Sequence, residues 1–231
     1  MPAAGVSGPG GLPLLAGTIS LLLVDESPIV REGCRRVFNE TCNIRVIAEA
    51  HNGEAACAQY VQEGPDIVVL EPRMRVMPGL GGLETIQKLK LADPGVRILI
   101  FSDSDNETAI LRTLRAGARG YLAKTRPVEQ LIDAVRVVAR GEHYIDATRA
   151  AAMLSAIISG VSAGPLEPLS PREYELFRLF AEGRSTAEIA RALSISPKTV
   201  GVHHTAIMRK LAITSVTQLV RLAIRCDVID P

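Results

Sequence analysis

Five short apolar runs in residues 19–140 alternate with five stretches of helical periodicity, and this alternation limits the possible folds most strongly. The runs LLLV, IVVL and ILIF lack polar alternation, which is the pattern of strands buried on both faces. Such strands, joined to helices by short connections, require a parallel sheet with right-handed crossovers. The sequence therefore predicts an α/β doubly wound domain with a five-stranded parallel sheet. The expected strands are 19–24, 44–50, 67–70, 97–102 and 120–124, and the expected helices are 28–40, 53–63, 83–91, 107–116 and 128–140.

Beyond residue 168 the pattern is purely helical, and the expected helices begin with capping signals. Three Ser-x-x-Glu or Ser-x-x-Gln motifs start at Ser170, Ser185 and Ser215, and each predicts a capping box. Ser196 is followed by proline, which fits the first position of a further helix, and Gly183 ends the first helix. The sequence therefore predicts an all-α second domain.

The length of 231 residues leaves room for two domains, and composition places their boundaries. Residues 1–18 are rich in Gly, Pro and Ala without periodicity, so we expect a disordered extension. Residues 19–140 form the α/β domain, and 141–167 form a linker with a helix and a Gly/Pro break. Residues 168–231 form the helical domain.

Local charge favours an anionic partner for the helical domain, although the net charge of the chain is only +1. Residues 189–226 contain no acidic residue, and they carry six lysines and arginines. The second and third helices of this domain are separated only by Ser194 and Ile195, which predicts a helix-turn-helix. The third helix could enter the major groove of DNA; the alternative is a small bundle with a solvated basic face.

Residues 168–228, with the run LSPREYELFRLFAEGRSTAEIARALSISPKTVGVHHTAIMRKLAI, resemble the LuxR-type helix-turn-helix of the NarL/FixJ family of transcription factors. The resemblance implies binding of double-stranded DNA as a homodimer. Gly201 departs from the lysine or other polar residue that the family usually has there, which removes a phosphate contact and weakens the helix by roughly 1 kcal/mol. The implied DNA contacts are Lys198, Thr199, Val200, His203, His204 and Lys210, and the implied dimer seam is Val216, Leu219, Val220 and Ala223.

Residues 19–140 resemble the receiver domain of response regulators, which has the flavodoxin-like fold of CheY. Receivers collect acids after strand 1, a phosphorylatable Asp after strand 3, Ser or Thr after strand 4 and Lys after strand 5. An aromatic residue couples this site to the output face. The matching residues are Asp25 and Glu26, Glu71, Ser102, Lys124 and the aromatic Tyr121.

Glu71 departs from the receiver pattern because it stands where the phosphorylatable Asp is expected. The additional methylene moves the carboxylate by up to ~1.5 Å, and an error of about 1 Å can cost roughly a hundredfold in an oriented reaction. The loop from Glu71 to Gly79 is about three residues longer than the family's usual loop. Arg73 or Arg75 could place a guanidinium where Mg²⁺ would bind. Formation of an acyl phosphate should therefore be poor.

Three hypotheses for this site remain open. In the first, Glu71 reaches Lys124 and Ser102 and holds an active-like, dimer-competent state without phosphate. In the second, the site is vestigial, and a ligand, a partner protein or abundance sets activity. In the third, the chain is a conventional two-component regulator phosphorylated by a sensor kinase. An alternative function from another class of protein is a protein-interaction module, in which the receiver no longer switches.

The remaining features exclude several function classes. No catalytic triad or metal-ligand spacing is present, so we expect no enzyme and no cofactor beyond a Mg²⁺ that Asp25 and Glu26 would hold if binding is retained. No run reaches the ~18 apolar residues of a membrane span, and we expect no export signal in residues 1–18 because no basic residue precedes their short apolar patch. The four cysteines lack paired spacing, which is typical of reduced thiols in the cytoplasm. Beyond DNA, RNA polymerase and a sensor kinase are partners to consider.

Overall fold

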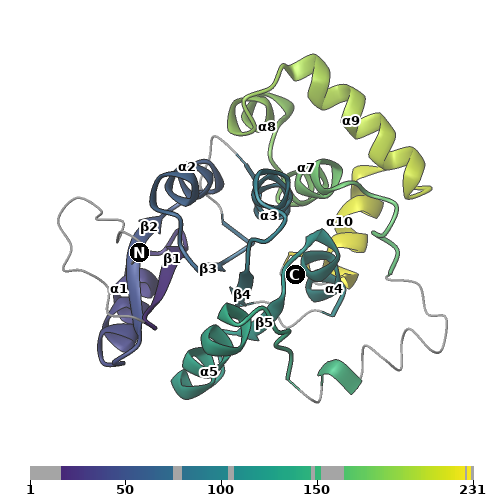
Figure 1. Ribbon diagram of the computed structural model, residues 1–231. Helices are drawn as coiled ribbons and strands as arrows, with labels where there is room; N and C mark the ends of the chain where they lie inside the picture. The colour runs from purple at the N-terminus through teal and green to yellow at the C-terminus, as the bar shows by residue number, and fades with distance from the viewer. Residues whose placement is uncertain are drawn as a thin grey trace.

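The apolar runs of the first domain form one parallel sheet in the order β2-β1-β3-β4-β5 (Figure 1). The computed structural model describes residues 17–74, 80–103, 107–146, 149–151, 164–226 and 228–229. The chain reverses its direction of strand addition between β1 and β3, which is the position where ligands bind in doubly wound sheets. The strands are β1 Ile19–Val24, β2 Ile44–Ala50, β3 Ile67–Leu70, β4 Ile98–Ser102 and β5 Gly120–Ala123.

Helices cover both faces of the sheet, as its buried strands require. Alternate residues of β1 face opposite ways: Leu21 and Leu23 pack with the helices of one face, and Leu22 and Val24 with those of the other. The predicted α/β doubly wound fold is thereby confirmed. The first face carries α1 Pro28–Asn39 and α5 Val128–Ala139, and the second carries α2 Gly53–Glu63, α3 Gly82–Ala92 and α4 Glu107–Ala116 (Figure 1).

The chain returns to the sheet after α5. Tyr144 lies beside the edge strand β5, where its carbonyl oxygen accepts from the amide of Tyr121 at 2.9 Å. Residues 149–151 are helical, within the predicted linker, and residues 147–148 and 152–163 of that linker lie outside the described residues. The predicted disordered extension lies outside them as far as residue 16.

The second domain contains four helices among the described residues: α7 Pro171–Ala181, α8 Thr186–Ala192, α9 Pro197–Lys210 and α10 Val216–Arg225. The capping boxes predicted at Ser170 and Ser185 are confirmed. The third is only half formed. Ser215 accepts from the amide of Gln218, but the Gln218 side chain accepts from the amide of Thr214 at 2.8 Å instead of closing the box.

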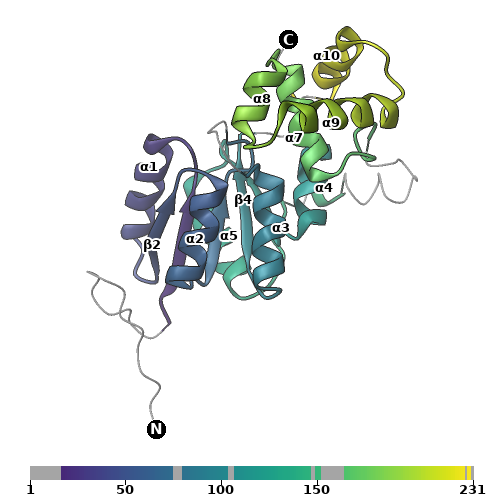
Figure 2. The same ribbon diagram turned by 90° about the horizontal axis from the view of Figure 1, so that it is seen from above.

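The two domains are in contact in the described part of the chain. Figure 2 shows the second domain against one end of the first, with α7 beside α3 and α4. In Figure 1, α9 lies on the far side of α7 from the sheet. No helix within the described ranges is long and apolar enough to cross a bilayer.

Candidate functional site

Four polar side chains meet at the carboxyl edge of the sheet because parallel strands all end there. Asp25 follows β1, Glu71 follows β3, Ser102 closes β4 and Lys124 follows β5. These side chains lie at the carboxyl edge near the switch point between β1 and β3, where ligands bind in doubly wound sheets. We call Asp25, Glu71, Ser102 and Lys124 the acid pocket.

Lys124 binds both carboxylates of the acid pocket. Its Nζ lies 2.6 Å from Asp25 Oδ2 and 3.1 Å from Glu71 Oε2. Burial acts to lower the pKa of Lys124, but the hydrogen bond to Asp25 and the charge of Glu71 outweigh it and hold the pKa above its ordinary value. Lys124 is therefore cationic at neutral pH, and it lies between the two buried carboxyl groups.

The Glu71 carboxylate has a partner for each oxygen and is only 5% exposed. Oε1 accepts from the Ser102 hydroxyl at 2.9 Å and from the Arg73 amide at 2.7 Å. Oε2 faces Lys124 and accepts from the Asp103 amide at 3.3 Å. The glutamate thus reaches the hydroxyl and the ammonium that neutralise a phosphoryl oxygen in receivers.

The acid pocket as arranged does not fit Mg²⁺. The Lys124 ammonium lies where a cation would bridge Asp25 and Glu71, and the other Asp25 oxygen accepts from the Ser27 amide at 2.8 Å. Among the described residues, no group of three acidic, histidine or cysteine side chains could hold a metal ion. Glu26 is only half-buried beside Asp25.

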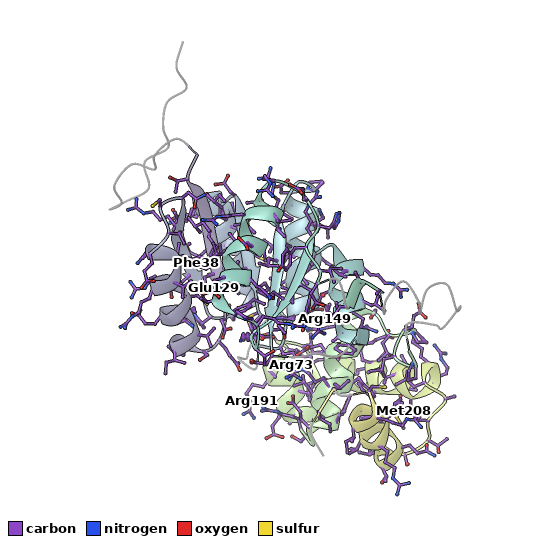
Figure 3. The ribbon with its side chains drawn as sticks, turned by 90° about the horizontal axis from the view of Figure 1, so that it is seen from below. Phe38, Arg73, Glu129, Arg149, Arg191 and Met208 are labelled. Atoms are coloured by element: carbon purple, nitrogen blue, oxygen red, sulfur yellow. The ribbon has the colours of Figure 1, made fainter. Side chains whose placement is uncertain are left out.

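The suggestion that the Arg73 guanidinium occupies the metal position is wrong, because this side chain lines a small cavity at the junction with α7, together with Tyr174 and Glu175. Figure 3 shows Arg73 between the two domains. Arg75 lies outside the described residues. Tyr121, the predicted coupling aromatic, is buried at 2% exposure with the Arg149 guanidinium 5.8 Å from its ring centroid.

An exposed stripe runs along α9, and we call it the reading surface because this is the helix that a helix-turn-helix is expected to present to DNA. Its members recur at three- and four-residue spacing, so they lie on one face of the helix. Val202 is 64% exposed, which suits contact with a thymine methyl group. The sequence prediction of DNA contacts did not include Val202, Thr205 and Arg209. Their helical spacing from Lys198 is the signal that could have identified them. The stripe consists of Lys198, Gly201, Val202, Thr205 and Arg209.

The other predicted DNA contacts have different surroundings. The prediction for Val200 is wrong, because its side chain is fully buried in the domain core. His204 packs edge-on against Phe180 with ring centroids 4.7 Å apart. Thr199 and His203 are half-buried beside the stripe. Lys210 Nζ lies 2.5 Å from Glu173 Oε2, so it stabilises the start of α7.

The predicted dimer seam is partly wrong. Leu219 and Ala223 are fully buried, because they are the residues that α10 packs against the core of its own domain. Val216 is 56% exposed and Ile224 is 36% exposed, with half-buried Val220 between them at four-residue spacing. An exposed apolar stripe therefore remains on α10, and it consists of Val216, Val220 and Ile224.

Gly201 offers a direct test of the reading surface. A Cβ built there meets nothing within 4 Å, so Gly201→Ala should stabilise α9 by about 1 kcal/mol. Gly201→Lys should also restore a phosphate contact. This contact should raise the DNA affinity and steepen the slope of log affinity against log salt concentration by about one. Thermal unfolding and binding titrations at several salt concentrations check both effects. An unchanged salt slope in Gly201→Lys would place residue 201 away from the DNA backbone.

The pair of Glu173 and Lys210 predicts a pH dependence of the second domain. Burial acts to raise the pKa of Glu173, but the hydrogen bonds from Lys210 and Ser170 outweigh burial, so the pKa is below its ordinary value. Because the pKa of Glu173 is lower in the folded state, its ionised side chain stabilises the fold at pH values above the unfolded pKa of about 4.3. This stabilisation is lost as the pH falls through the folded-state pKa. Acid titration of unfolding should show this loss below pH ~4. Lys210→Met should flatten the loss, while Arg209→Met should leave it in place.

A doubly wound sheet with acidic, hydroxyl and lysine side chains at its carboxyl edge, joined to a helix-turn-helix with an open reading surface, defines a DNA-binding response regulator. Residues 21–136 match the response regulator receiver domain, and residues 167–223 match the bacterial regulatory proteins of the luxR family. The chain belongs to this NarL/FixJ family of response regulators and is a transcription regulator, not an enzyme.

Three relatives match this chain over all or nearly all of their length. The oxygen regulatory protein NreC of Staphylococcus carnosus is 33% identical over 218 residues, which cover 92% of this chain and 100% of that protein. The crystal structure of the response regulator ChrA of a heme-sensing two-component system is 33% identical with a TM-score of 0.50, covering 92% of this chain and 100% of ChrA. RcsB of Salmonella enterica bound to the rprA promoter shares the fold at 23% identity and a TM-score of 0.66, covering 89% of this chain and 98% of RcsB.

Proposed function

We propose that the chain regulates transcription in the cytoplasm as a homodimer on a roughly palindromic DNA site, and that Glu71 supplies the activating charge that phosphorylation supplies in other receivers. The half-site centres are separated by about one helical turn, ~34 Å, or a multiple of it. The exposed stripe of α9 supports the DNA contact, and the apolar stripe of α10 supports the dimer.

One observation carries the proposal for Glu71. Its carboxylate contacts both the Ser102 hydroxyl, at 2.9 Å, and the Lys124 ammonium, at 3.1 Å. These two groups would otherwise neutralise a phosphoryl oxygen, so a carboxylate that engages both can hold them in the position that they take around phosphate. The charge belongs to the side chain and requires no phosphorylation, which makes the active-like state the default.

Selection of DNA from a random pool by the purified chain, with no phosphodonor present, tests this function. We expect enrichment of a palindrome. Failure to enrich any site would contradict default activation and indicate that the receiver holds the helix-turn-helix domains off DNA or apart.

Conventional phosphorylation is the second candidate, and the similarity to ChrA, which belongs to a two-component system, favours it. Asp25 and Asp103 both lie within the reach of Lys124 and would be the remaining acceptors. Incubation with radiolabelled acetyl phosphate separates the candidates. Stable incorporation of label that raises DNA affinity would support phosphorylation, whereas no incorporation supports the role of Glu71.

A further inference from the structure

Arg112 of α4 attaches the receiver to the start of the second domain. Its Nη1 donates to the carbonyl oxygen of Leu166 at 2.6 Å, and its Nη2 donates to that of Leu169 at 2.8 Å. The guanidinium carbon also lies 4.3 Å from the ring centroid of Tyr174 on α7. A planar guanidinium can make two such bonds and stack at the same time, which an ammonium cannot do.

Arg172 of α7 makes a second attachment. Its Nη1 lies 2.9 Å from Glu84 Oε2 on α3, and its Nη2 donates to the carbonyl oxygen of Leu193 at 2.8 Å. Leu193 ends α8 and begins the turn that leads into α9. The arginine therefore connects α3 of the receiver with the turn that sets the direction of the reading helix.

Both receiver helices in this junction follow segments that are bonded to Glu71. The amide of Arg73, in the segment before α3, donates to Glu71 Oε1, and the amide of Asp103, before α4, donates to Oε2. The first segment packs tightly against α3, since a Cβ on Gly82 would lie 2.2 Å from the Pro72 carbonyl oxygen. The junction is thus built on the same loops as the acid pocket.

We propose that Arg112 and Arg172 are positioning residues for DNA recognition, which hold α9 at a fixed orientation on the receiver and so make the half-site spacing a property of the receiver dimer. The inference rests on the proposed function as a dimeric DNA-binding regulator. The junction engages α7, while the stripe of α9 remains exposed, so the attached state can read DNA. A domain on a free tether would accept many spacings, whereas an attached domain accepts few.

The test uses the full chain and DNA with two selected half-sites whose spacer is varied base pair by base pair, together with DNA that carries one half-site. The variant is Arg112→Lys, which keeps the charge but loses the paired carbonyl bonds and the stacking. Arg115→Ala is the matched control on the same helix, because its ion pair with Glu167 is exposed, at 55% and 42% for the two side chains.

The wild-type chain and Arg115→Ala are expected to bind one spacer, or spacers one helical turn apart, at least tenfold more tightly than the others. Arg112→Lys should lose about tenfold at the best spacer and show a flat profile, while its binding to the single half-site and its melting temperature stay unchanged. A sharp profile in Arg112→Lys, or higher affinity at every spacer, would overturn the positioning role. A flat wild-type profile with intact half-site binding would overturn this inference alone, and absence of any DNA binding would overturn the proposed function.

Discussion

Replacement of Glu71 by glutamine is expected to lower the affinity of the chain for its selected palindrome by tenfold or more, with no phosphodonor present. Glutamine keeps the size of the side chain but removes the charge, so the 3.1 Å ion pair with Lys124 is lost and the bond from Ser102 weakens. A tenfold loss corresponds to about 1.4 kcal/mol, which is close to the lower end of the range for a single charged hydrogen bond. Titration of labelled DNA measures the effect.

Two controls define what the Glu71→Gln result means. Glu40→Gln removes one exposed negative charge at the end of α1, outside the acid pocket, and should leave the DNA affinity unchanged. Glu71→Asp keeps the charge but shortens its reach toward Lys124 and Ser102, so it should also bind DNA weakly. Equal DNA binding by Glu71→Gln and the wild-type chain would show that the pocket is vestigial and that another input sets activity.

Replacement of Lys124 by methionine is expected to lower the free energy of unfolding by about 3–5 kcal/mol at pH 7, because it leaves two buried carboxylates without a cation. The side chains of Asp25 and Glu71 are only 3% and 6% exposed. Because the folded-state pKa of Lys124 is raised, its stabilisation is complete below the unfolded value of about 10.4 and is lost only as pH rises through the folded value. Urea unfolding at pH 7 measures the loss.

The double variant Lys124→Met with Glu71→Gln should recover part of this stability, since only one buried charge then remains. Lys88→Met, on the exposed face of α3, is the matched control and should change stability by less than about 0.5 kcal/mol. If Lys124→Met were as stable as the control, the ammonium would contribute no net stability in the pocket, and the ion pairs seen in the structure would be offset by the cost of burial.

The strand endings carried most of the information about the acid pocket. An uninterrupted apolar run such as Ile67–Leu70 must be buried on both faces, and in a parallel sheet the residue after it lies at the carboxyl edge. Asp25, Glu71 and Lys124 could therefore be predicted to converge without knowledge of any contact. The contacts of the Glu71 oxygens with the amides of Arg73 and Asp103 could not, because any residue type carries the same backbone donor.

The helices of the second domain were harder to orient than to find. The apolar residues of α10 lie on one broad face that includes both Leu219 and Val216, so its sequence did not decide that the first is buried while the second is exposed. Val200 and Val202 on α9 present the same difficulty, with one buried and the other 64% exposed. The face that a helix buries depends on which neighbours it packs against, and those neighbours are distant in the chain.

By itself, the sequence determined the α/β receiver, the helix-turn-helix and the residues at the edge of the sheet, because hydrophobic periodicity and capping residues are local signals. Only the tertiary structure decided that Glu71 engages Lys124 and Ser102 together, and that Arg112 attaches α4 to residues 54 and 57 positions further along the chain. These contacts depend on packing between distant segments, and the acceptors of the Arg112 guanidinium are main-chain carbonyls, which every residue possesses.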